Sequence, residues 1–302
     1  MRNLSLPYTV CITILLQIFH TNCWAFLPSL GLGCKIPSKV IACKELAMFF
    51  AEQVEANEPN ASFNILTCEG DEASILLVSD LMVDAFWINS PQQRVQDGAA
   101  VSNAARSKLV MVQHSDLMDK YGERIGRRVL ASNLLLALET NSNELLGAVC
   151  IDVCLLDKTY EQIIQVDKSE NLLRNAVASL GPKQRRQYKD STVERIVEDL
   201  LPAEIQPVCC LSNLVVSPNA RRRGVAKRLC DEAERVARFE WGYREIFLKV
   251  EADNVAARNL YLKNIGYSIM YVNPEEPSLR VNAAIESFVE VKSDTLILSK
   301  AI

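Results

Sequence analysis

Histidine is scarce in this sequence, and the cysteines lack the spacing of a metal site. Only His20 and His114 could supply imidazole, and none of the ten cysteines fall in a C-x-x-C pair. Structural zinc sites need closely spaced pairs of such ligands. We therefore expect no metal, and we interpret the cysteines as buried, reduced thiols of a compartment that does not oxidise its proteins.

An excess of charge of either sign is also missing. Lys and Arg number 33 against 37 Asp and Glu, which gives a formal net charge of -4 over 302 residues. No global field would draw such a chain to nucleic acid or to an anionic membrane. With 49% hydrophobic residues, the chain is long enough for one large domain with appendages, as in an ordinary soluble enzyme.

Residues 1–25 resemble a secretory signal peptide. Arg2 provides a basic start, an apolar run covers residues 8–19, and Cys23-Trp24-Ala25 places small residues at a cleavage site. Polar residues interrupt the apolar run, which is too short to span a bilayer comfortably. A permanent anchor is thus the less favoured interpretation, and we expect no stable membrane association of the mature protein.

Residues 26–61 resemble a transit peptide followed by a linker. The stretch from Phe26 to Lys44 contains lysines and serines but no acidic residue. A signal peptide followed directly by Phe and an acid-free basic stretch is similar to the bipartite plastid presequence of algae with secondary plastids. We expect the plastid as destination, with the secretory pathway as the alternative, and a mature domain over residues 62–302.

Hydrophobic periodicity predicts alternating strands and helices from residue 63 onward. A polar turn at residues 140–143 favours a hairpin between two of the strands. Residues 157–207 are charged and Gln-rich, which indicates a partly helical insertion, and the basic run at residues 183–186 is better explained as a solvated face than as a binding patch. The expected strands are 63–68, 134–139, 145–155, 209–216 and 245–251, and the expected helices are 72–87, 101–121 and 226–239.

The junction between strand 209–216 and helix 226–239 has the composition of an anion site. Its sequence is Arg221-Arg222-Arg223-Gly224-Val225-Ala226. Backbone N–H groups at a helix start are free and lie at the positive end of the helix dipole. Gly224 would let the backbone approach a phosphate, and the arginines could clamp its oxygens. The alternatives are a plain basic helix start or a nuclear-localisation-like run.

Two motifs in this region resemble signatures of the GNAT acyltransferases. Leu214-Val215-Val216-x-Pro218 followed by Arg221-x-x-Gly224-x-Ala226 is similar to their acetyl-CoA motif. Downstream, Asn254-x-x-Ala257-x-x-x-Tyr261 and Gly266-Tyr267 resemble their closing helix and strand. The resemblance covers residues 134–271 well and 63–87 loosely. The insertion and Ala226, where glycine is commoner, depart from the pattern, and the insertion leaves the acceptor groove in doubt.

The resemblance implies an α/β fold with a mixed central sheet of about 6–7 strands, splayed in the middle and flanked by helices, with its core at residues 132–274. It implies acetyl-CoA as co-substrate and no metal. Its pantetheine arm would bind the backbone of Leu214, Val215 and Val216, and its pyrophosphate the loop from Arg221 to Lys227. Asn254 would contact the cofactor, although it could simply cap a helix.

The implied reaction is direct attack of a primary amine on the thioester. Tyr261 is carried over as the general acid for the CoA sulfur, against the alternative of a core aromatic. The base stays open between Glu251, Asp152 and water near Ser212 and Asn213. The sequence of these two motifs is especially similar to that of plastid GNATs. This resemblance implies protein N-termini or lysines as acceptors. Alternatives are a small-molecule amine or a non-catalytic acyl-CoA-binding module, and nucleic-acid binding is the weakest.

Overall fold

The computed structural model describes residues 62–89, 101–123, 129–282 and 287–302. The presequence expected at residues 1–61 lies outside the described residues, so both of its proposed parts stay predictions. Among the described residues, no helix combines the length and apolar character needed to cross a membrane.

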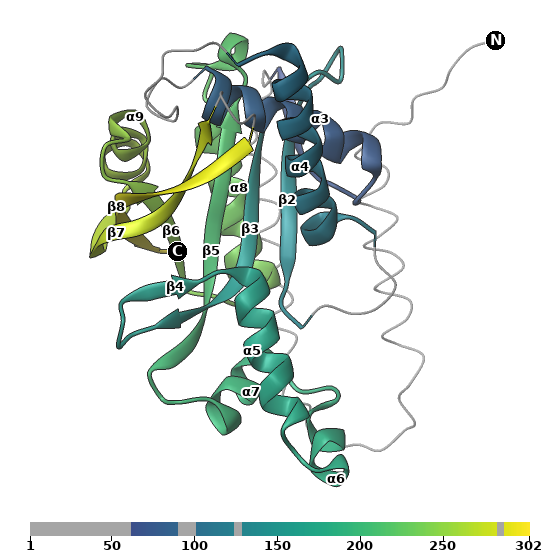
Figure 1. The fold of residues 1–302 in the computed structure, drawn as a ribbon, viewed down its shortest axis with the longest axis vertical. Coiled ribbons are helices and arrows are strands. Elements are labelled where there is room, and N and C mark those ends of the chain that lie inside the picture. Colours follow the sequence, from purple (N-terminus) through teal and green to yellow (C-terminus); the bar gives the residue numbers. More distant parts are fainter. Residues whose placement is uncertain (1–61, 90–100, 124–128, 283–286) are drawn as a thin grey trace, which may run out of the picture. The chain divides into compact units, whose positions relative to one another are not determined.

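A mixed, eight-stranded sheet forms the centre of the described part (Figure 1). The strand order is β1-β2-β3-β5-β6-β8-β7, with β4 paired to β3 off this path. Neighbours are antiparallel except β5 and β6, which are parallel. The strands are β1 Phe63–Thr67, β2 Ser132–Glu139, β3 Leu145–Asp157, β4 Gln162–Ile164, β5 Ile205–Val216, β6 Glu245–Glu251, β7 Ser268–Asn282 and β8 Ser287–Ala301.

Helices cover both faces of this sheet, which confirms the expected α/β class (Figure 1). On one face, α3 Glu72–Val83 and α4 Asn103–Tyr121 pack on Leu134, Leu136 and Cys150. On the other, α8 Val225–Arg235 packs on Leu135, Ile151 and Leu211. Because side chains of a strand alternate between its faces, β2 and β3 supply both cores.

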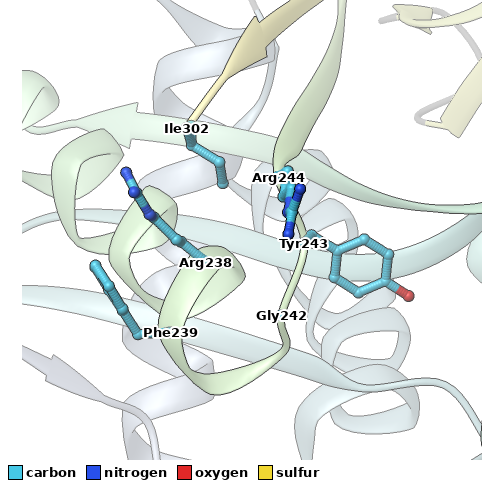
Figure 2. Close-up of a pocket in the computed structure, with 6 residues that line it drawn as sticks. All are labelled: Arg238, Phe239, Gly242, Tyr243, Arg244 and Ile302. Carbon is cyan, nitrogen blue, oxygen red and sulfur yellow. The ribbon is translucent and has the colours of Figure 1, made fainter. Parts of the chain in front are cut away.

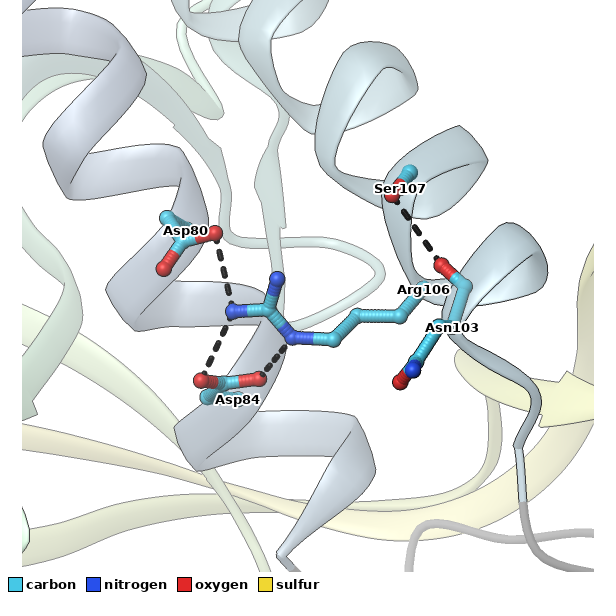
Figure 3. Close-up of polar contacts among 5 residues, drawn as sticks. All are labelled: Asp80, Asp84, Asn103, Arg106 and Ser107. Atoms are coloured by element: carbon cyan, nitrogen blue, oxygen red, sulfur yellow. Dashed lines mark hydrogen bonds and ion pairs between the residues drawn. The ribbon is translucent and has the colours of Figure 1, made fainter.

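Side-chain contacts fix the pair α3 and α4. Asp71 and Ser102 cap the two helices by accepting from the N–H groups of Ser74 and Ala105 at 2.8 and 3.1 Å. Arg106 of α4 reaches across and forms ion pairs with two aspartates of the preceding helix, at 2.8 Å to Asp80 and 2.7 Å to Asp84 (Figure 3). This fork is the geometry in which arginine binds carboxylates best.

The segment predicted to be an insertion, residues 157–207, is partly helical in the structure. Val166, Leu173, Ile196 and Val197 pack with Leu155 of β3 in a separate apolar cluster. The basic run falls on a short, exposed turn of this segment, as a solvated face requires. The insertion contains strand β4 and the helices α5 Val166–Ala178, α6 Pro182–Arg185, η3 Arg186–Tyr188 and α7 Val193–Leu200.

The three helices expected at 72–87, 226–239 and after Asn254 each begin as α-helix and end as π-helix. The π segments are η1 Asp84–Ile88, η5 Val236–Glu240 and η6 Asn259–Ile265. A π turn holds more residues than an α turn, so it changes which side chains share a face. The closing helix α9 is therefore regular only over Val255–Arg258.

The long hairpin of β7 and β8 at the C-terminal end was not predicted. It inserts β8 between β6 and β7, where Leu296, Ile297 and Leu298 are buried. Together with β4, it raises the strand number to eight, above the expected range. Several apolar side chains of β7 are exposed, namely Ile269, Met270, Val272 and Leu279. The apolar residues of this strand therefore do not mark one buried face, which weakens the periodic signal.

Candidate active site

The parallel strands β5 and β6 separate partway along their length. They pair only at Cys209 with Ile246, Cys210 with Phe247 and Leu211 with Leu248. Beyond these pairs, β5 continues to residue 216 alongside β3, and β6 to residue 251 alongside β8. We call the space between residues 212–216 and 249–251 the opening. Backbone groups at its two edges are not used by the ladder between these strands.

A β-bulge explains why the pairing stops there. Ala148 pairs with Val215 and Cys150 with Ser212, so Asn213 and Leu214 of β5 together oppose a single residue of β3. Asn213 has a positive φ of 53°. A bulge bends its strand and increases the local twist. It therefore turns β5 away from β6 immediately after Leu211.

The loop after β5 has the conformation of an anion cradle. Gly224 lies in the left-handed region with φ 83° and directly precedes helix α8. The first bond of that helix joins the Arg228 N–H to the Gly224 carbonyl at 3.1 Å. The N–H groups of residues 225–227 come before it and have no acceptor within the helix. A Cβ on Gly224 would meet no atom within 4 Å, so the backbone dihedral requires this glycine, and the space beside it is open.

The opening and the cradle share one cavity of about 740 Å³. This volume is within the range typical of small-molecule sites. Six residues predicted to bind the cofactor line it, namely Leu214, Val215, Val216, Arg221, Ala226 and Asn254. The lining also includes side chains that the sequence did not single out: Phe86 and Trp87 from η1 and Pro277, Ser278 and Leu279 from β7.

Other predicted side chains of the loop point elsewhere. The Arg223 guanidinium donates to Ser62 Oγ at 2.7 Å and pairs with Glu139 at 2.9 Å. Lys227 pairs with Asp231 at 2.8 Å, and that partner raises its pKa. Arg222 is exposed with a positive φ of 64°, and Val225 is buried in the core. The side chains of Arg223, Val225 and Lys227 therefore lie away from the cradle. Their backbone N–H groups, rather than these side chains, are the groups near it.

Asn254 and Tyr261 are separated by the structure. Asn254 lines the cavity and also caps α9, because its Oδ1 accepts from the Ala257 N–H at 3.1 Å. Tyr261 is buried in the core on the α8 side, with its ring 5.7 Å from that of Tyr267. Burial raises the pKa of the Tyr261 hydroxyl, and Cys230 adds to this shift. Residues seven apart on a regular α-helix face the same side, but Tyr261 lies in a π turn, where this spacing does not hold.

The two carboxylates considered as base have different surroundings. Glu251 ends β6 and is held by the Arg280 guanidinium at 2.7 and 3.0 Å, and it also accepts from Ser278. Asp152 of β3 is 4% exposed and accepts from Tyr121. The residues that the structure describes contain no cluster of three or more His, Cys, Asp or Glu side chains suited to a metal ion.

A second hollow of about 480 Å³ lies away from these residues (Figure 2). Arg238 and Phe239 border one side of it, and Tyr243, Arg244 and Ile302 border the other. It contains none of the predicted site residues, and it lies where η5 ends and β6 begins, away from the separated ends of β5 and β6. We therefore assign the candidate site to the cavity at the opening.

Comparison with known proteins gives the family of this region. Residues 196–267, which include β5, the cradle, α8 and β6, match the model of the acetyltransferase (GNAT) family. This region of the chain is therefore similar to the GNAT acetyltransferases. This confirms the family resemblance of the two sequence motifs, both of which lie within the matched residues.

Individual relatives are similar over limited regions. The chloroplastic GCN5-related N-acetyltransferase 7 of Arabidopsis thaliana is 43% identical over 54 residues, which are 18% of this chain and 19% of that protein. The chain thus spans about a fifth of the curated relative that it matches. Arabidopsis thaliana NAA60 in complex with acetyl-CoA has a TM-score of 0.44 at 14% identity, covering 80% of this chain and 98% of that one. A GNAT acetyltransferase from Streptococcus pneumoniae has a TM-score of 0.40 at 14% identity, covering 80% and 99%.

Proposed function

We propose that this protein is an acetyl-CoA-dependent N-acetyltransferase that acetylates primary amines. The observation that carries the proposal is that one cavity joins the opened strand pair to the glycine-led helix start. The first feature offers free backbone groups in a row, and the second offers N–H donors at a helix dipole. A ligand with an amide-containing arm and a pyrophosphate matches both, and CoA has these two parts.

Binding would divide between backbone and side chains. The edge of β5 at Leu214, Val215 and Val216 would hold the pantetheine as an added strand, while residues 221–227 would bind the pyrophosphate through backbone N–H groups. Arg221 lines the cavity and would add a guanidinium to this anion site. Ala226 lines it too, and its small side chain keeps the first helical turn accessible. Asn254 would contact the cofactor while it caps α9.

The chemistry would be a direct transfer between two bound reactants. The amine attacks the thioester carbonyl, and the C–S bond breaks as the N–C bond forms. The chain must orient the two partners, remove a proton from nitrogen and stabilise the departing sulfur. Tyr261 remains our candidate for the last task. Its hydroxyl, whose pKa is raised further by burial, would donate a hydrogen bond to the sulfur.

We further propose that the acceptor is the α-amine of a protein N-terminus or a lysine side chain, and that the protein works in a plastid. The local similarity to a relative named as a chloroplastic GCN5-related N-acetyltransferase supports the plastid. The protein acceptor is what the resemblance of the two motifs to plastid GNATs implies. The acid-free composition of residues 26–44 also favours the plastid. A fluorescent protein fused after residue 60 should then enter the plastid of a diatom-like host, and cytosolic or secreted fusion protein would contradict this.

The decisive experiment measures binding and transfer separately. Purified protein is titrated with acetyl-CoA by calorimetry, and then incubated with labelled acetyl-CoA and three acceptors: an unblocked peptide, polylysine and spermidine. Transfer to the peptide or polylysine supports the full proposal, whereas transfer to spermidine alone indicates a small-molecule enzyme. Binding without transfer would indicate an acyl-CoA-binding module, and absence of binding would remove the site.

A further inference from the structure

A group of polar side chains lies at the narrow end of the opening. Ser212 is the first residue of β5 after the last parallel pair, Leu211 with Leu248. Its Oγ donates to Asp152 Oδ2 at 3.5 Å across the boundary between β5 and β3. Ser212 is partly exposed, whereas Asp152 lies beneath it at 4% exposure. A carboxylate therefore stands directly behind the point where the two strands part.

Helix α4 holds this carboxylate from the other side. The hydroxyl of Tyr121, at the last turn of α4, donates to the two oxygens of Asp152 at 3.1 and 2.9 Å. Burial raises the pKa of Tyr121, with contributions from Cys150 and Asp152, so the phenol stays a donor. The contacts from Tyr121 and Ser212 fix the orientation of the Asp152 carboxylate, because rotation about the Cβ–Cγ bond would break at least one of them.

Two other carboxylates beside the opening, Glu251 and Glu276, are engaged by cations. Glu251 is bound in a fork by Arg280, whose guanidinium does not lose its proton in proteins. Glu276 is paired with Lys249, the residue of β6 that follows Leu248. Hydroxyl groups such as those around Asp152 differ from these cations, because a hydroxyl can accept one proton as it gives up another. The contacts of Asp152 thus suit proton transfer better than those of Glu251.

We propose that Asp152 takes up the proton that the acceptor ammonium must lose, with the Ser212 hydroxyl as the carrier and Tyr121 as the positioning residue. The inference rests on the proposed function. The ammonium gives a proton to Ser212 Oγ while Ser212 gives its own to Asp152, which leaves a neutral amine and a carboxylic acid. The amine nitrogen then bonds to the thioester carbon, the C–S bond breaks, and the sulfur, which accepts a hydrogen bond from Tyr261 in the proposed function, takes the second nitrogen proton. Asp152 finally releases its proton to water.

The test compares Asp152→Asn with a matched change on the same strand. Asparagine keeps the size of the side chain and an oxygen that can accept from Tyr121, but it cannot take up a proton at neutral pH. Asp157→Asn makes the same chemical change at the far end of β3, where Asp157 accepts from the backbone of Thr159 at 2.9 Å. Asparagine can accept the same bond, so this variant controls for the loss of one charge.

The readouts are kcat with an unblocked peptide or polylysine, the acetyl-CoA Kd, and the pH profile of kcat/KM from pH 6 to 10. At pH 7 we expect Asp152→Asn to lose about 10²–10⁴-fold in kcat with an unchanged Kd. The deficit should shrink as pH rises, because the amine then loses its proton to solvent.

The groups that face Asp152 or influence the same cluster are Lys120 and Tyr121 of α4, Cys150 and Cys154 of β3, and Cys209, Ser212 and Asn213 of β5.

The outcomes separate this inference from the proposed function. Wild-type kcat in folded Asp152→Asn, or a deficit that is constant with pH, would overturn the role of Asp152 while transfer by the wild type stands. If Asp152→Asn does not fold, Ser212→Ala decides, with a loss of tenfold or more that shrinks at high pH expected, and full activity as the contrary result. A wild-type protein that binds acetyl-CoA but acetylates neither acceptor would overturn the proposed function and this inference together.

Discussion

Strands β5 and β6 are paired over residues 209–211 and 246–248 and separated over residues 212–216 and 249–251. In the paired half, all six residues are buried, from 0% to 8% exposed. In the open half, Val215 and Val250 are still buried, but Ser212, Leu214 and Val216 are only partly buried and Asn213 is exposed. A cavity of about 740 Å³ borders residues 214–216 of β5. The same two strands therefore serve as core at one end and as a candidate binding site at the other.

The difference does not come from a lack of β-branched residues in the open half, which has Val215, Val216 and Val250, whereas the paired half has only Ile246. It comes from the bulge at Asn213 and Leu214, which takes β5 out of the plane of its neighbour. If β5 and β6 had remained paired, the backbone groups that the open half presents to the cavity would have formed hydrogen bonds between the two strands. The core supports the site by keeping the strands fixed at the point where they part.

The largest effect that we expect concerns the boundary between the two halves. Tyr261 packs in the same cluster as Leu211 and Leu248, whereas Asn254 lines the cavity. If the Tyr261 hydroxyl serves the departing sulfur, Tyr261→Phe should lower kcat by about 10²–10⁴-fold and leave the acetyl-CoA Kd and the Tm nearly unchanged. Steady-state kinetics, calorimetry and thermal melting on one variant check this. Wild-type kcat would assign Tyr261 to the core alone.

Truncation in the paired half should affect stability instead of binding. Leu248 is 1% exposed, so Leu248→Ala should lower the free energy of unfolding by about 2–5 kcal/mol, through lost burial and the cavity left behind. Urea denaturation measures this. Val272→Ala on the edge strand β7, where the side chain is 59% exposed, is the control and should change stability by less than about 0.5 kcal/mol. A similar loss in both variants would contradict the assignment of the paired half as core.

A charge placed in the cradle should affect binding more than stability. Gly224→Glu would set a carboxylate against the pyrophosphate site, and acetyl-CoA affinity should fall at least tenfold, about 1.4 kcal/mol. Gly242→Glu is a matched control, because Gly242 also has a positive φ, of 79°, and open space around it, yet it borders the other hollow. Both variants carry the same strain and charge. Equal affinities by calorimetry would remove the loop from the site.

The smallest effect is a difference in thiol reactivity that reports whether the paired half opens. Burial raises the pKa of Cys209, and it raises that of Cys150 to about 12. At pH 8 a thiol with a pKa near 12 is thiolate to only about one part in 10⁴, and the thiolate is the reactive form. Cys68 is partly exposed. Iodoacetamide followed by peptide mapping should label Cys209 and Cys150 at least tenfold more slowly than Cys68.

The pH dependence of this labelling gives a second check. Because these pKa values are raised, reaction of Cys150 should increase with pH well above 9, where an unperturbed thiol is already ionised. Rapid labelling of Cys209 at pH 8 would show that β5 and β6 also separate in the paired half. The paired half and the open half would then differ only in the degree to which β5 and β6 separate.

Most helices and strands followed from periodicity, because each buries one face. The strand predicted at 245–251 coincides with β6, and the predicted start and end of β5 and α8 are close to those observed. The C-terminal hairpin was missed because much of its length is exposed and its apolar residues do not follow one buried face. The π turns were missed because they do not change composition, only the number of residues per turn.

For the site, the sequence by itself determined the parts that depend on local backbone chemistry. A glycine before a helix start, preceded by arginines and an apolar strand, fixed the cradle, because only a residue without Cβ adopts the left-handed dihedral at low cost. The two motifs that resemble the GNAT signatures named six of the residues that line the cavity, five in the first motif and Asn254 in the second.

Tertiary structure alone decided which side chains share that cavity and which carboxylate can work there. Arg223 is drawn to Glu139, 84 residues away in sequence, and Glu251 to Arg280, 29 residues away. Asp152 meets Tyr121 and Ser212 only because α4, β3 and β5 pack together. Such contacts depend on strand register and helix packing across the whole domain. A local stretch of sequence therefore does not predict which partner a charged side chain will contact.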